Sequence, residues 1–196
     1  MASNDPQLDA SRSPELMNAV DTAVLVVDTQ EKLLNVVAGR EQVQWNIRRL
    51  LDAARALDMP RGAVEQYPEK LGTTPAEIAQ RLPRPTSKLT FSGAACCPLL
   101  SEWRAAGRSR VLICGIETHV CVAQTAFDLS AAGWLVYVAA DAVATRYPID
   151  HEIALRRMES AGIILTTTEA AMFEWCQVAG TPEFKMISNL AKEKSP

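Results

Sequence analysis

Cys121 is the side chain of this sequence best placed for nucleophilic chemistry. It follows the apolar run 110–115 across the connection 116–119 and begins the next helical stretch, where unpaired N–H groups and the helix dipole favour an anion. We expect these groups, with a nearby lysine, to lower the pKa of the thiol and to hold an oxyanion formed from a carbonyl substrate. The alternative is that Cys121 is a small apolar core residue, as free cysteines commonly are.

Asp28 and Lys88 are the candidate partners of that cysteine. Asp28 directly follows the apolar, β-branched run 22–27, so it either caps the next helix or exchanges a proton with the nucleophile and the leaving group. Lys88 follows Pro83 and Pro85, which force an extended approach to it. It is either a solvated surface residue or a buried cation at the end of a strand or loop.

Strands that alternate with amphipathic helices should position these residues. This order predicts an α/β fold with right-handed crossovers, a mostly parallel sheet and helices on both faces. Ligands bind beyond the carboxyl ends of such strands, where residues 28, 88 and 121 are expected. Strands are predicted at 22–27, 62–66, 110–115, 134–140 and 163–166, and helices at 41–57, 75–82, 97–106, 120–132, 150–160, 169–178 and 183–192.

The composition is that of one globular domain, expected over residues 16–196 after a loose polar tail at 1–15. A formal net charge of −3 gives no electrostatic footprint for nucleic acid or for an anionic membrane, so neither is an expected partner. No window of the sequence is long and apolar enough to cross a bilayer. Five cysteines without framework spacing, and no secretion signal, indicate free thiols and a cytoplasmic protein.

Motifs for metals and cofactors are weak, and we expect neither. A zinc site on Cys114, His119 and Cys121 would need strand and turn residues to converge unusually. His119 is expected to line or border the pocket instead. The pair Cys96 and Cys97 lacks the spacing of a redox motif, and glycine-rich phosphate-binding motifs are missing from the sequence.

The segment VLICGIETHVCVAQTAFD at 111–128 closely resembles the nucleophile region of the isochorismatase-like hydrolases. The segments AVLVVDTQEKL, EQYPEKLG, SKLTFS and TTTEAAMFEW accompany it in the order typical of that family. The resemblance covers roughly residues 21–189 and is greatest to the isochorismatase-domain-containing branch.

The resemblance implies a catalytic triad of Asp28, Lys88 and Cys121 in a three-layer α/β/α fold with a six-stranded parallel sheet. It also implies a cis peptide bond between Ile116 and Glu117 that aims the N–H groups of residues 117 and 121 at the substrate oxygen. The candidate pocket residues are Gln30, Leu33, Gln66, Phe91 and His119, although Phe91 could equally be a core residue.

Departures from the family pattern narrow the expected activity. The segment EQYPEKLG lacks the histidines with which nicotinamidases hold a metal ion, and true isochorismatases lack the cysteine that is present at position 121. The expected activity is therefore cysteine hydrolysis of a small amide, N-carbamoyl or related C–N substrate through a thioester. The alternatives are a catalytically idle, self-associating interaction module and a thiol redox sensor; relatives associate, so a homo-oligomer is expected.

Overall fold

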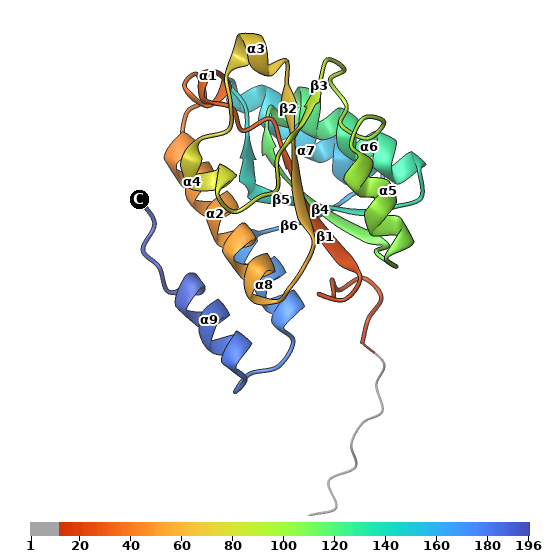
Figure 1. The fold of residues 1–196 in the computed structure, drawn as a ribbon, viewed down its shortest axis with the longest axis vertical. Coiled ribbons are helices and arrows are strands. Elements are labelled where there is room, and N and C mark those ends of the chain that lie inside the picture. Colours follow the sequence, from red (N-terminus) through yellow and green to blue (C-terminus); the bar gives the residue numbers. More distant parts are fainter. Residues whose placement is uncertain (1–11) are drawn as a thin grey trace, which may run out of the picture.

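The computed structural model describes residues 12–196 and has a single parallel sheet at its centre (Figure 1). The strands lie in the order β3-β2-β1-β4-β5-β6, and each pairs in parallel with its neighbours. Their bounds are β1 Thr22–Val27, β2 Arg61–Gln66, β3 Thr86–Lys88, β4 Arg110–Ile116, β5 Leu135–Ala144 and β6 Ile164–Thr166. The predicted six-stranded parallel α/β fold is confirmed.

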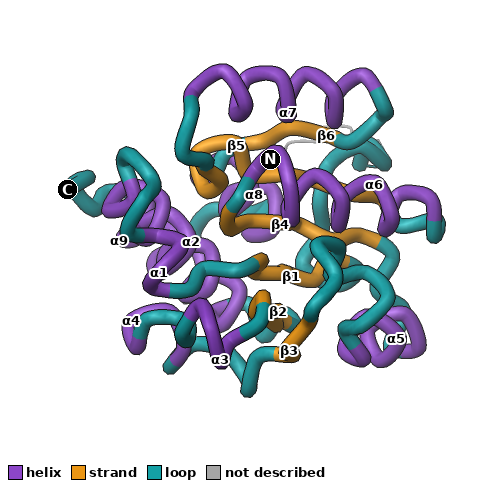
Figure 2. Tube along the Cα trace, turned by 90° about the horizontal axis from the view of Figure 1, so that it is seen from above, coloured by secondary structure: helices purple, strands orange, loops and turns teal. Residues whose placement is uncertain are grey.

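Helices cover both faces of the sheet, which Figure 2 shows from above. The elements between and after the strands are α1 Glu31–Leu34, α2 Arg40–Ala56, α3 Pro68–Leu71, α4 Ala76–Ala79, α5 Pro98–Ala105, the π-helical turn η1 Thr118–Val122, α6 Ala123–Ala131, α7 Pro148–Ser160, α8 Thr168–Cys176 and α9 Pro182–Ala191. The buried side chains of α2, α4, α8 and α9 pack on one face of the sheet, and those of α5, α6 and α7 pack on the other.

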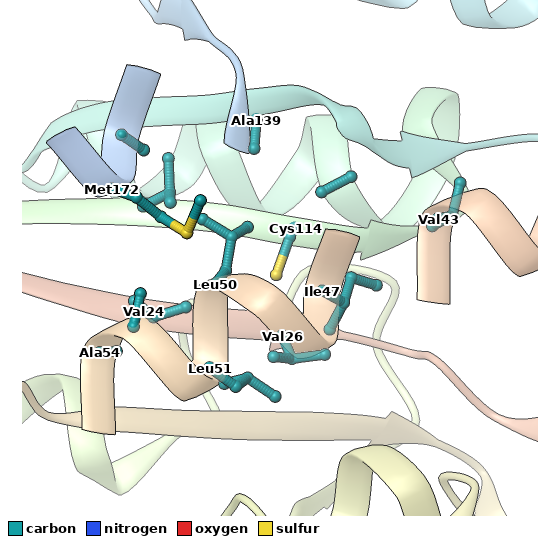
Figure 3. Close-up of a cluster of buried hydrophobic side chains, with 14 of the residues drawn as sticks. Val24, Val26, Val43, Ile47, Leu50, Leu51, Ala54, Cys114, Ala139 and Met172 are labelled. Atoms are coloured by element: carbon teal, nitrogen blue, oxygen red, sulfur yellow. The ribbon is translucent and has the colours of Figure 1, made fainter. Parts of the chain in front are cut away.

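Two apolar cores result, because alternate strand residues point to opposite faces. In β1, Val24 and Val26 pack against Ile47 and Leu50 of α2, whereas Leu25 and its alternate neighbours face α5 and α6. Figure 3 shows the core on the α2 side. Burial of β1 on both faces explains why its sequence reads as an unbroken apolar run.

Strand order reverses between β1 and β4, which creates the crevice in which α/β proteins bind ligands. The two strands approach closely at their carboxyl ends, where Gly115 pairs with Val27. A Cβ atom on Gly115 would lie 2.0 Å from the Val27 carbonyl oxygen, and its φ of 129° also requires glycine. This contact brings the segment after β4 directly beside Asp28.

Several element bounds differ from those predicted. The short helices α1 and α3 were not predicted, since four residues carry too little periodicity to be recognised. Strand β5 continues to Ala144 because a register shift opposite residues 113–115 lets it follow β4 to its end. The helix predicted from residue 120 begins two residues earlier, as η1.

Most of the tail predicted at 1–15 lies outside the described residues. Within residues 12–15, the carbonyl of Pro14 accepts a hydrogen bond from Arg110, and that of Glu15 accepts one of 2.6 Å from Tyr137. Among residues 12–196, no helix has the length and apolarity needed to cross a membrane.

Candidate active site

A buried ion pair joins Lys88 to Asp28 at the carboxyl edge of the sheet. The Lys88 Nζ lies 2.7 Å from Asp28 Oδ2, and both side chains have an exposed fraction of 0%. Asp28 follows β1 and Lys88 ends β3, the strand two places away. Isolated charges are rarely buried because of the desolvation cost, so each group depends on the other and on further polar contacts.

Three more oxygen atoms hold the Lys88 ammonium group. It donates hydrogen bonds to Gln66 Oε1 at 2.7 Å, to the Phe91 carbonyl at 3.0 Å and to the Thr90 carbonyl at 3.2 Å. The loop that follows β3 therefore wraps around the side chain at the end of β3. This arrangement fixes the cation in position and compensates for its lost hydration.

Cys121 places its thiol close enough to Asp28 and Lys88 for both side chains to act on its ionisation. It lies in η1, just beyond the end of β4, and only 6% of the residue is exposed. The structure thus brings the three predicted catalytic residues into one group, the buried cluster of residues 28, 88 and 121.

The expectation of a lowered thiol pKa is wrong. Burial raises the pKa of Cys121 to about 12, and the Asp28 carboxylate adds to this effect, while Lys88 offsets only part of it. Sequence position at a helix start does not reveal how deeply the sulfur is buried. At neutral pH the sulfur is therefore a thiol in the free protein.

The Asp28 carboxyl group also has a shifted pKa. Burial raises the pKa of its carboxyl above the ordinary value of 3.8, although Lys88 and the Cys121 thiol both act in the opposite direction. Its two oxygen atoms differ: Oδ2 binds Lys88, whereas Oδ1 is buried and has no hydrogen-bond partner among the described residues. Oδ1 is therefore a buried acceptor that no donor of the described residues uses.

The connection between β4 and η1 contains the predicted cis peptide bond, between Ile116 and Glu117. The Glu117 side chain is buried, with 8% of the residue exposed, and its Oε1 forms an ion pair of 2.7 Å with Arg146 Nε. Thr118 Oγ1 lies 3.1 Å from Nδ1 of His151. Glu117 is thus joined to the connection between β5 and α7, and Thr118 to α7 itself.

His119 lies in the same segment, between two carboxylates. Its Nδ1 is 3.6 Å from Glu117 Oε2, and its Nε2 is 3.7 Å from Asp150 Oδ2. The ring is about one quarter exposed. Within residues 12–196, no three histidine, cysteine, aspartate or glutamate side chains are grouped to hold a metal ion.

Comparison with known proteins gives the family. The family model for the isochorismatase domain matches residues 22–170, which contain all three residues of the buried cluster. The chain belongs to the isochorismatase family. Isochorismatase domain-containing protein 2 from Bos taurus is 39% identical over 173 residues, which cover 88% of this chain and 84% of that protein. The corresponding protein from Danio rerio is 36% identical, over 89% of each chain.

Solved structures of family members share the fold. The MAR1 ribonuclease from Caenorhabditis elegans superposes with a TM-score of 0.84 at 36% identity, covering 92% of this chain and 94% of that one. The YcaC gene product of Escherichia coli, an octameric hydrolase of unknown specificity, has a TM-score of 0.77 at 25% identity, covering 86% and 85%. The chain thus has the fold of the isochorismatase-family hydrolases.

The residues expected to line the substrate pocket differ in their contacts and in their burial. Gln66 contacts the Lys88 ammonium, whereas His119 lies between Glu117 and Asp150. Gln30 is fully buried, and its amide bonds the backbone of Gln66 and Gly72, so it joins β1 to β2. Among the described residues, these backbone groups are its hydrogen-bond partners, and they leave it little capacity for a ligand.

Leu33 and Phe91 differ in burial. Leu33 is half-buried and packs against the core on the α2 side. The Phe91 ring is not a core residue, because 55% of the residue is exposed; its carbonyl, not its ring, contacts Lys88. An aromatic residue in a loop gives no sequence signal that separates these roles.

Sequence reasoning missed two residues of this site. Arg146, which binds Glu117, lies in a connection without a recognisable motif. Thr125 is fully buried and donates a hydrogen bond of 2.6 Å to the Cys121 carbonyl. A threonine four residues after a helical residue can always make such a bond, so its spacing from Cys121 is the one signal the sequence offers.

Proposed function

We propose that the protein is a cysteine hydrolase that cleaves a small amide, N-carbamoyl or related C–N substrate through Cys121, Asp28 and Lys88. The observation that carries this proposal is the fully buried ion pair of Asp28 and Lys88, close enough to the Cys121 thiol for both groups to act on its ionisation. A buried charged pair costs desolvation energy and is weak evidence for stability, so its place beside a potential nucleophile favours a chemical role.

In the proposed first half-reaction, the Cys121 sulfur attacks the substrate carbonyl carbon as its proton passes to Asp28 Oδ1. Lys88 remains beside both groups and stabilises the negative charge that moves from Asp28 to the sulfur and then to the substrate. Collapse of the tetrahedral intermediate breaks the C–N bond. The leaving nitrogen takes the proton from Asp28 and departs as ammonia or an amine, which leaves a thioester on Cys121.

In the second half-reaction, water attacks the thioester while Asp28 accepts a water proton. The C–S bond then breaks, the sulfur regains a proton from Asp28, and the carboxylic acid departs. The sum is amide plus water giving acid plus amine, and it requires no redox partner or cofactor. One carboxylate thus serves as base and acid in both steps, in agreement with its raised pKa.

A turnover panel tests this proposal. Ammonia release from acetamide and N-carbamoylglycine, and nitrophenolate release from 4-nitrophenyl acetate, are measured for the wild type and for Cys121→Ala and Asp28→Asn. The control is Cys176→Ala, which removes a half-buried cysteine of α8. We expect both variants of the buried cluster to lose turnover and the control to keep it. Turnover that survives in Cys121→Ala would rule the scheme out.

Two further experiments, trapping of the acyl group and an assay with RNA, distinguish the proposed hydrolase from the alternative functions. Mass spectrometry after rapid acid quench should find the acyl group on Cys121. Preferential peroxide oxidation of Cys121 without turnover would favour a thiol redox sensor instead, and inertness in every assay would favour an interaction module. Because a related protein is named as a ribonuclease, the panel includes single-stranded RNA. The net charge of −3 leads us to expect no cleavage.

We also propose that the protein is a cytoplasmic homo-oligomer that binds neither nucleic acid nor membranes. The octameric E. coli relative supports self-association, and five free cysteines suit a reducing compartment. A relative from Phytophthora sojae is a secreted effector, so the compartment needs a direct test. Light scattering on the eluting protein measures its mass, and fractionation of the cells that produce it measures its location.

A further inference from the structure

The loop that holds Lys88 and the turn that carries Cys121 meet at one buried side chain, Thr125 of α6. Its hydroxyl donates a hydrogen bond of 2.6 Å to the Cys121 carbonyl. The same oxygen accepts one of 2.9 Å from the backbone N–H of Gly93, in the loop after β3. Thr125 has an exposed fraction of 0%, so water does not compete for either bond.

This loop also supplies the oxygen atoms that fix the Lys88 ammonium, through the carbonyls of Thr90 and Phe91. A short path therefore runs from the ammonium, through residues 90–93 and the threonine hydroxyl, to the backbone of Cys121. Asp28 joins the path through its ion pair with Lys88. Three segments far apart in sequence are tied together around the sulfur.

The packing around Gly93 shows that the loop after β3 lies very close to β2. A Cβ atom at position 93 would lie 3.1 Å and 3.3 Å from the two methyl groups of Val64, tighter than ordinary van der Waals contact. The loop is thus pressed against β2, and its N–H reaches Thr125 because residue 93 has no side chain. A hydroxyl at position 125 satisfies a buried N–H that would otherwise lack a partner.

We propose that Thr125 is a positioning residue for the reaction: it sets the place of the Cys121 sulfur relative to Lys88 and Asp28 by joining the η1 turn to the Lys88 loop. This inference rests on the proposed function. An ordinary helical threonine bonds the carbonyl four residues earlier and nothing else. Here the bond from Gly93 makes the same hydroxyl a bridge between two parts of the buried cluster.

The test compares Thr125→Val with Thr125→Ser, using 4-nitrophenyl acetate as the probe. Valine keeps the size of threonine and removes both hydrogen bonds, whereas serine keeps the hydroxyl. A displacement of about 1 Å at a reacting atom costs on the order of 100-fold in rate, so we expect kcat of Thr125→Val to fall about 10- to 100-fold with KM nearly unchanged. Serine should restore most of the lost rate.

Gly93→Ala disturbs the same bridge from the loop side, through contact with Val64, and should also lower kcat more than it raises KM. It decides the matter if Thr125→Val does not fold. If Thr125→Val folds and its kcat equals that of the wild type, the inference is overturned. If Thr125→Val does not fold, a wild-type kcat in Gly93→Ala overturns it. Equal losses in valine and serine variants also overturn it, because the hydroxyl would then be irrelevant. Turnover retained in Cys121→Ala instead overturns the proposed function, so the two failures are distinguishable.

Discussion

Replacement of Asp28 by asparagine should change turnover and thiol ionisation in opposite directions. The variant lacks the proton acceptor, so hydrolysis should be lost. It also lacks the negative charge that helps to raise the pKa of Cys121, while Lys88 keeps its positive charge beside the sulfur. The thiol should therefore ionise more readily in the inactive variant than in the wild type.

The size of the expected shift in the Cys121 pKa follows from the charge that the substitution removes. Two unit charges about 4 Å apart interact by about 4 kcal/mol at an effective dielectric constant of about 20. Since one pKa unit corresponds to about 1.4 kcal/mol, loss of the Asp28 charge should lower the thiol pKa by about 2 to 3 units. From a starting value of about 12, the thiolate fraction at pH 8 rises roughly 100- to 1,000-fold.

The assay is the pH dependence of iodoacetamide alkylation, read on the peptide that contains Cys121. Peptide-resolved detection matters because Cys96 and Cys176 are partly exposed and also react. Asp128→Asn, at an exposed position of α6, is the matched control and should leave the profile unchanged. If Asp28→Asn alkylates no faster than the wild type, or its apparent pKa rises, the electrostatic account of the buried cluster is refuted.

The same variant should reveal the pH dependence of stability. The folded pKa of Asp28 lies above its ordinary value of 3.8, so its contribution to the free energy of unfolding is fully present below 3.8. That contribution is lost as pH rises through the folded pKa. Urea unfolding should therefore show the wild type losing stability relative to Asp28→Asn as pH rises from below 3.8 towards neutrality.

Three further substitutions test the framework of the site. Lys88→Met should lower the free energy of unfolding by about 3 to 5 kcal/mol in urea titrations at neutral pH, because it leaves Asp28 charged and unpaired in the interior. Gln30→Leu should cost about 1 to 3 kcal/mol in the same assay, since it deprives partly buried backbone groups of Gln66 and Gly72 of their partners. Gly115→Ala should not give soluble protein on expression, because its Cβ would overlap the Val27 carbonyl; normal yield would contradict the close approach of β1 and β4.

Strands and their carboxyl ends could be predicted from the sequence because burial on both faces leaves a local trace. The run 22–27 is apolar throughout, and the predicted strand has the bounds of β1. The place of Asp28 follows directly, since it is the next residue. Lys88 was harder: β3 has three residues, and its two preceding prolines predict extended backbone without indicating burial.

Contacts between distant segments left no such trace. The contacts of Thr125 with Gly93, and of Arg146 with Glu117, join residues 32 and 29 positions apart, and neither pair has a periodic pattern. Likewise, the sequence placed Cys121 at a helix start and so predicted a lowered pKa. Burial and the neighbouring carboxylate raise the pKa instead, and both depend on the complete fold.

The raised pKa of Cys121 agrees with a nucleophilic role once charge is counted over the whole buried cluster. Loss of the thiol proton to water would leave two anions and one cation in a nearly dry site, which explains the value of about 12. Transfer of that proton to Asp28 leaves one thiolate, one neutral carboxyl and one ammonium, so the net charge stays at zero. The same desolvation also raises the pKa of Asp28, so burial opposes this transfer less than it opposes loss of the thiol proton to water. Burial thus keeps the resting sulfur protonated, and a proton passed to Asp28, as proposed, avoids the extra charge that its loss to water would create.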